Sequence, residues 1–179
     1  MLRVPDDDDL YIETSALKLS PVFRSDTPSL YELLKEPRLY LFTADRPLGS
    51  PEELGQRIEG WERRLSPDGR ELWLNWTIRE RNTSAVVGYV QASVSESVAE
   101  LAWVVGVPYQ SHGIATEAAR AVVGWISSRF AVGLKANIHP NHTASQSVAQ
   151  KLGLKATSDV SPEGEIVWRR PVELKEEHP

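Results

Sequence analysis

The sequence predicts an α/β (α+β) protein with a mixed sheet of about seven strands and helices on both faces. Three observations lead to this prediction. Segments of alternating polarity and segments of helical spacing follow the order strand, helix, helix, three strands, helix, strand, helix, two strands. The length of 179 residues suits one domain with a substantial core. The chain also has no internal repeat and no apolar run near the ~20 residues of a membrane span.

The beginning of the chain is acidic and polar. Residues 1–10 include four aspartates, which predicts a disordered leader, so the single folded domain is expected to span 11–175. Alternating polarity predicts a first strand over 11–19, and a short helix reaching about Lys35 follows it.

The middle of the chain carries clearer signals. A capping box with proline at the first helical position, Ser50-Pro51-Glu52-Glu53, starts a helix that apolar spacing continues to about residue 65. Alternating patterns then predict three strands, at 72–78, 85–94 and 98–107.

The last third predicts two helices and three strands. An Ala-rich pattern indicates a helix over 114–129, and a short strand at 134–138 precedes a helix over 142–152 that a glycine ends. Two final strands are expected at 154–159 and 165–171.

Composition excludes several function classes. The chain has no cysteine, and its four histidines lack the spacing of metal ligands, so we expect no metal and no cysteine acyl-enzyme. The net charge of -5 disfavours nucleic acid and anionic membranes as partners and favours a cationic substrate such as an amine. The acidic start does not resemble a signal peptide, which predicts a cytoplasmic protein. Monomer and homodimer both stay open.

The stretch from Gly106 to Gly153 is the most informative. A strand ends in a loop, and Gly113 leads directly into a helix whose first N–H groups can hold a phosphate. It is not a P-loop, because no G-K-[ST] follows Gly113, and the seven-residue spacing from Gly106 does not fit a Rossmann turn. A tight strand-to-helix turn needs glycine as well, so the loop alone leaves both interpretations open.

Three segments resemble the GNAT N-acetyltransferase superfamily, in its RimJ/RimL-like branch. The acyl-CoA signature R/Q-x-x-G-x-G/A is similar to Gln110-Ser111-His112-Gly113-Ile114-Ala115. Two further segments, Asn141-His142-Thr143-Ala144-Ser145 and Lys151-Leu152-Gly153-Leu154, resemble the N-x-x-S and K-L-G-F motifs of that branch. The resemblance is strongest over 85–155 and departs from the family text at Gln110, commonly arginine, and at Leu154, commonly aromatic.

The resemblance implies a fold and an activity. It implies a mostly antiparallel sheet with a splayed acyl-CoA cleft, acetyl-CoA as cosubstrate, and transfer of the acetyl group to a primary amine by direct attack. The amine would belong to a small molecule or to the N-terminus of a protein.

The resemblance also implies which residues bind the cofactor. The end of the strand at 98–107 would pair with the pantetheine arm, the N–H groups of the following loop would hold the pyrophosphate, and an asparagine would contact the pantetheine. The candidates are Val105, Val107, Gln110, Ser111, His112, Gly113, Ile114, Ala115 and Asn141.

Ser145 is the candidate acid. It shares one face of its predicted helix with Asn141, next to an expected core row of Ala144, Val148 and Leu152. Through the resemblance, Ser145 would protonate the departing CoA thiolate.

Glu100 is the candidate general base. It lies in a segment, Ala99-Glu100-Leu101-Ala102-Trp103, that is similar to the family's A-E-I-G-Y text; a solvated glutamate at a strand end is the equal alternative. The resemblance further implies that a backbone N–H near Val105 stabilises the oxyanion. Two rival classes remain: a non-catalytic acyl-CoA-binding regulatory domain and a nucleotide-binding domain.

Overall fold

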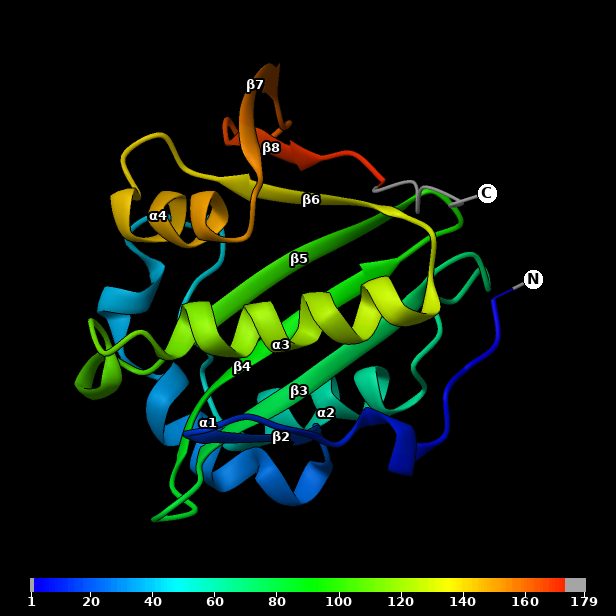
Figure 1. The fold of residues 1–179 in the computed structure, drawn as a ribbon. Helices are drawn as coiled ribbons and strands as arrows, with labels where there is room; N and C mark the ends of the chain where they lie inside the picture. Colours follow the sequence, from blue (N-terminus) through cyan, green and yellow to red (C-terminus); the bar gives the residue numbers. More distant parts are fainter. Residues whose placement is uncertain (1, 173–179) are drawn as a thin grey trace.

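The computed structural model describes residues 2–172, which form one sheet with helices on both faces (Figure 1). The eight strands are β1 (Ile12–Glu13), β2 (Leu17–Pro21), β3 (Leu72–Glu80), β4 (Val86–Val94), β5 (Val98–Val105), β6 (Gly133–Ile138), β7 (Lys155–Val160) and β8 (Ile166–Arg170). Their order in the sheet is β1-β2-β3-β4-β5-β6-β8-β7. All neighbouring strands are antiparallel except β5 and β6, so the predicted mixed, mostly antiparallel fold is confirmed.

Four α-helices cover the sheet: α1 (Thr27–Leu34), α2 (Pro51–Glu62), α3 (Ile114–Arg129) and α4 (Thr143–Lys151). Helix α3 crosses one face, and α1 and α2 lie behind the sheet on the other (Figure 1). Each face has its own apolar core, the larger one under α3 and a smaller one under α1 and α2. Because β3 lies between the two cores, the neighbouring residues Trp76 and Thr77 are both fully buried although their side chains point to opposite faces of the sheet.

The first predicted strand is broken, which gives eight strands instead of about seven. Residues 14–16 form a turn, in which the N–H of Leu17 donates to Thr14 Oγ1 at 2.9 Å. The two halves therefore pair with each other, Ile12 opposite Leu19, as a small hairpin at the edge of the sheet. Residues 173–175 of the expected domain lie outside the described range.

The end of the leader, Asp7–Leu10, is docked on the domain, which corrects the expected disorder for this part of residues 1–10. Asp7–Leu10 form a 3-10 turn, and Leu10 is buried against the larger core. Two indole N–H groups hold its backbone: Trp76 donates to the carbonyl of Leu10 at 2.8 Å, and Trp125 donates to the carbonyl of Asp9 at 2.6 Å. The acidic composition concealed this docking because the two indole contacts use backbone carbonyls, the apolar contact uses a single leucine, and, among the described residues, only one leader aspartate, Asp7, pairs with a cation, the buried Arg64.

The parallel pair β5–β6 is short. Only three residue pairs join the strands, ending at Glu100 opposite Lys135, although β5 continues to Val105 and β6 to Ile138. Beyond that point the strands diverge toward the side of α4, as Figure 1 shows. The strands are parallel because α3 forms the crossover between them. Among the described residues, no helix is long and apolar enough to cross a membrane.

We expect Leu10→Ala to lower the free energy of unfolding by about 2–5 kcal/mol, because it leaves a cavity where the leader meets the core. Chemical denaturation measures this change. Tyr11→Ala is the matched control, since the neighbouring Tyr11 side chain is 56% exposed and should change stability little. Equal effects of the two substitutions would contradict the docked leader.

Candidate active site

The divergence of β5 from β6 leaves one edge of β5 without a strand partner. The N–H of Gly106 donates to the carbonyl of Val87 on β4. Because backbone groups alternate along a strand, those of Val105, Trp103 and Leu101 point the other way, toward β6. The carbonyl of Val105 accepts from Gln110 Nε2 at 3.0 Å. This edge can pair with an extended ligand, as an added strand would.

The loop after β5 ends at the N-terminus of α3. Ser111 and Gly113 adopt left-handed backbone conformations, with φ of 65° and 79°, and helix α3 begins immediately afterwards at Ile114. The first N–H groups of a helix have no intrahelical partner, and nothing lies within 4 Å of the place where a side chain of Gly113 would be. The 16-residue helix thus presents free donors and its positive dipole end to an open space, which is what an anion needs.

Helix α4 begins on the other side of the gap, beyond β6. Its N-cap is His142, whose Nδ1 accepts from the N–H of Ser145 at 3.5 Å, so Asn141 does not cap the helix. Asn141 is exposed, and its N–H donates to His139 Nδ1 at 3.1 Å. Ser145 is half-buried in the first turn.

The core row of α4 differs from the expected one. The buried residues are Val148, Ala149 and Leu152, all in the C-terminal half of the helix or just after it. Ala144, in the first turn, is exposed. The helix packs on the sheet only after its first turn, so Ala144 is too close to the end of the helix to reach the core. Ser145 is half-buried and lies one turn before the buried Val148 and Ala149, in the first turn of the helix.

A loop from the far face of the sheet reaches this region. Phe42, between α1 and α2, packs against both histidines of the β6–α4 turn, with its ring centroid 5.5 Å from that of His139 and 4.9 Å from that of His142. Burial and the neighbouring His139 lower the pKa of His142. His142 is therefore a neutral acceptor at pH 7, as its capping role requires.

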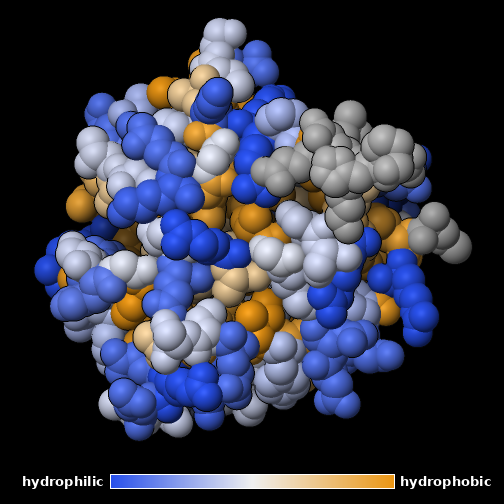
Figure 2. All heavy atoms as spheres, viewed as in Figure 1, coloured by the Kyte–Doolittle hydropathy of each residue, from blue (hydrophilic) through white to orange (hydrophobic). Residues whose placement is uncertain are grey.

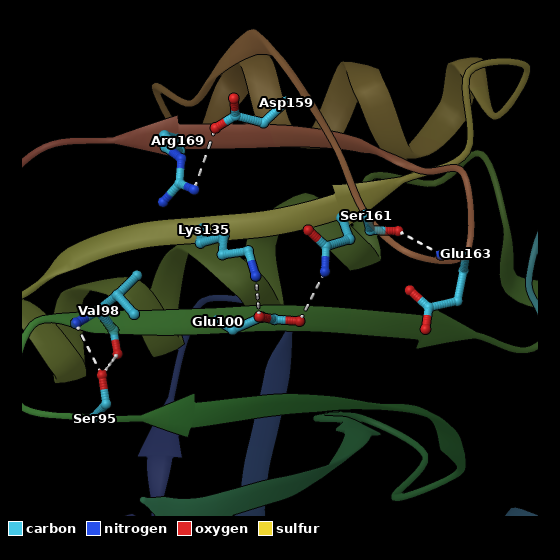
Figure 3. Close-up of polar contacts among 9 residues, drawn as sticks. Ser95, Val98, Glu100, Lys135, Asp159, Ser161, Glu163 and Arg169 are labelled. Atoms are coloured by element: carbon cyan, nitrogen blue, oxygen red, sulfur yellow. Dashed lines mark hydrogen bonds and ion pairs between the residues drawn. The ribbon is translucent and has the colours of Figure 1, made fainter.

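Glu100 lies at the point where β5 and β6 part. Its carboxylate accepts from Lys135 Nζ at 2.7 Å and from Asn137 Nδ2 at 3.0 Å, and these contacts bridge the two strands (Figure 3). Glu100 shares its face of β5 with Val104, which packs in the core under α1 and α2. It therefore faces the side of the sheet opposite α3.

Further carboxylates gather on the same side as Glu100. Glu163 projects from the β7–β8 turn toward β5 (Figure 3). Extending the β6–β8 register by one pair beyond Ile138 and Ile166 puts Glu165 opposite His139, on the face of Asn137 and Glu100. Burial, and then the negative charges of Glu163, Glu100 and Asp45, raise the pKa of Glu165.

A family model described as an acetyltransferase (GNAT) domain matches residues 16–155. The chain belongs to this GNAT family. The match covers the sheet from β2 to the start of β7, with the gap between β5 and β6 inside it. The comparison with curated proteins gave no match.

Solved GNAT structures share the fold over their whole length. RimL, titled a ribosomal L7/L12 α-N-protein acetyltransferase in complex with coenzyme A, is 17% identical, with 90% of this chain and 98% of that chain covered and a TM-score of 0.76. A GNAT-family acetyltransferase from Bacillus anthracis has the same identity and coverage and a TM-score of 0.74. An acetyltransferase from Agrobacterium tumefaciens is 20% identical, covers 95% of this chain and 96% of that chain, and has a TM-score of 0.68.

The GNAT fold brings most of the expected site residues around one gap. Val105 lies on the open edge of β5, and the residues from Gln110 to Ala115 form the loop and the first turn of α3. Asn141 and Ser145 lie at the start of α4, across the gap. Val107 differs from the expectation: β5 ends at Val105 because Gly106 and Pro108 turn the chain into a 3-10 segment, Val107–Tyr109.

Three contributions to the site had no clear signal in the sequence. The capping role of His142 was hidden because asparagine is the stronger capping residue by propensity. Phe42 lies in a loop far from the histidines in the sequence. Glu165 reads as part of a hairpin turn, S-P-E-G-E, and only the pairing of β8 with β6 brings it near Glu100.

We expect His142 to make the unfolding free energy pH-dependent. Its pKa is lowered on folding, so the unfolded chain binds its proton first as the pH falls. The stability that neutral His142 provides is complete above the ordinary histidine value of ~6.5 and is lost progressively below it. Denaturation of the wild type and of His142→Asn between pH 5 and 8 measures this difference, with His112→Asn as the exposed control; identical slopes in all three proteins would refute it.

Proposed function

We propose that this GNAT protein transfers the acetyl group of acetyl-CoA to a primary amine by direct attack within a ternary complex. The observation that carries the proposal is the divergence of β5 and β6 beyond Glu100, directly beside the free N-terminus of α3. The pantetheine arm would pair with the open edge of β5. The pyrophosphate oxygens would accept hydrogen bonds from the backbone N–H groups of residues 110–115. Asn141, exposed at the start of α4, would contact the pantetheine.

The carboxylates opposite α3 support an amine as the acceptor. Asp45, Glu100, Glu163 and Glu165 interact electrostatically on that side, where a protonated amine would be attracted before it loses its proton. RimL, which shares the fold, is titled an α-N-protein acetyltransferase. We therefore propose both a protein N-terminal amine and a small amine as acceptor classes. The cytoplasmic location and the choice between monomer and homodimer stay predictions.

Two groups would handle the transition state and the leaving group. The N–H of Val105, on the open edge of β5, would stabilise the oxyanion, where one such donor contributes about 10²–10³ in rate. Ser145, at the N-terminus of α4, would donate its hydroxyl proton to the CoA thiolate as the carbon–sulfur bond breaks.

Glu165 is the stronger candidate for the base. The amine must lose a proton to attack the thioester, and a carboxylate accepts it better when its pKa is raised. The carboxylate of Glu100 is already engaged by Lys135 and Asn137. Glu165 has a raised pKa and no hydrogen bond or ion pair to its carboxylate among the described residues. We propose Glu165 as the base and keep Glu100 as its rival.

The test of the function is CoA release from acetyl-CoA in the presence of free amines and of short peptides with free N-termini. We expect turnover with at least one class, and about a hundredfold lower kcat in Ser145→Ala, since general acids contribute roughly 10²–10⁴. Ser147→Ala, two residues further along α4, is the control and should keep full activity. Tight acetyl-CoA binding without turnover on any acceptor would favour the regulatory, non-catalytic alternative.

The two candidate bases are separated by pH profiles of kcat/KM. Glu165 must be ionised to act, so the wild-type rate should fall as the pH drops through its raised pKa. We expect Glu165→Gln to lower kcat/KM by about 10²-fold or more and to remove this fall of the rate at low pH. Glu100→Gln should keep the fall at low pH. The reverse result would assign the base to Glu100.

A further inference from the structure

An open cavity of about 630 Å³ adjoins the N-terminus of α3. It begins at Gly113 and extends over the outward face of the first turns of the helix. The turn at Thr14 and Ser15 forms one wall, and Lys151, the last residue of α4, forms the other. The surrounding face is largely hydrophilic, with small separate apolar areas (Figure 2), so a polar ligand suits this cavity better than an apolar one.

Two cationic side chains line this cavity together. Arg120 and Lys151 come from different helices, and Arg120 NH2 lies 3.5 Å from the carbonyl oxygen of Lys151, which keeps the two residues adjacent. Both side chains are exposed, and within the described part of the chain neither forms an ion pair. In a protein of net charge -5, two cations without an ion-pair partner at one cavity, against one carboxylate, favour an anion there.

The one carboxylate in the cavity lining is already engaged. Glu117 Oε1 accepts from Thr14 Oγ1 at 2.6 Å, from the N–H of Ala16 at 3.1 Å and from Ser15 Oγ at 3.3 Å. These donors lower its pKa. Glu117 thus fixes the β1–β2 turn as a wall of the cavity, and within the described residues its carboxylate forms no ion pair with Arg120.

The spacing relates this pair of cations to the pyrophosphate position. About 10 Å of helix axis separates Gly113 from Arg120 at ~1.5 Å per residue. A ribose that carries phosphates at its 3′ and 5′ positions spans less than this, and the extended side chains of Arg120 and Lys151 are long enough to cover the difference. In coenzyme A, the group beyond the pyrophosphate is such a ribose, and its 3′-phosphate is a dianionic monoester near neutral pH.

We propose that Arg120 and Lys151 bind the 3′-phosphate of coenzyme A and make the protein discriminate against cofactors that lack it. The inference rests on the proposed function, because it takes the pyrophosphate to lie at the N-terminus of α3. Arg120 offers a planar fork of donors to the phosphate oxygens, and Lys151 adds a point charge from the opposite side. The pair therefore selects the cofactor and does not take part in acetyl transfer.

The test compares the affinities of coenzyme A and of dephospho-coenzyme A by isothermal titration calorimetry. For the wild type we expect coenzyme A to bind about tenfold more tightly at low salt, with the difference shrinking as ionic strength rises. In Arg120→Gln, Lys151→Gln and the double variant, the ratio of the affinities for coenzyme A and dephospho-coenzyme A should fall toward one. The affinity for dephospho-coenzyme A itself should stay unchanged. Lys155→Gln, an exposed lysine that does not line the cavity, should keep the full preference.

The outcomes separate this inference from the function on which it rests. If the wild type binds both cofactors equally, or if the variants keep the preference, the phosphate site is wrong and the acetyltransferase stands. If the wild type binds neither cofactor, both proposals fail. Inorganic phosphate that competes with coenzyme A, but not with dephospho-coenzyme A, would support the site as well. Melting temperatures of the variants, measured without ligand, show that any lost preference is not lost folding.

Discussion

The site depends on the end of pairing between β5 and β6. Each strand has an antiparallel neighbour on its other side, and these ladders are longer than the three pairs that join β5 to β6. Beyond Glu100 and Lys135 each strand follows that neighbour, so the gap is held open by the sheet on both sides. The protein thereby gains an unpaired backbone edge in its interior, where it can receive a ligand without offering an open sheet edge to other chains.

The two sides of the gap differ in charge. The end of α3 offers free N–H groups, with Arg120 and Lys151 nearby, whereas Glu165 and its neighbouring carboxylates lie on the opposite side of the sheet. A polyanionic cofactor and a cationic amine would therefore be drawn to different sides, each repelled from the other's. Such a separation favours an ordered ternary complex, in which the reacting atoms meet at the gap and the charged ends remain in solvent.

Sequence reasoning succeeded where one periodic pattern dominated. Helix α3 has the predicted bounds, and the capping box starts α2 at Pro51 with Ser50 as its cap. The failures share a cause, which is contact between residues distant in the chain. The docking of Leu10 depends on two tryptophans from β3 and α3, and the proximity of Glu165 to Glu100 depends on the pairing of β8 with β6. The proposed roles of Ser145 and of the cofactor loop come from a motif resemblance, which names the residues but not their contacts.

The two indole contacts of the leader are made to backbone carbonyls, so they depend on where the chain runs and not on the side chains of residues 9 and 10. The indole N–H groups of Trp76 and Trp125 could donate to the carbonyl of any residue at positions 10 and 9, provided that an apolar side chain fills the position of Leu10. Removing the segment, in contrast, would strand two indole donors within the larger core at a cost of about 1–3 kcal/mol each. In the docked turn Asp7–Leu10, the position of the backbone thus matters more than the side chains at 8 and 9, whereas Asp7 and Leu10 each contact a buried partner.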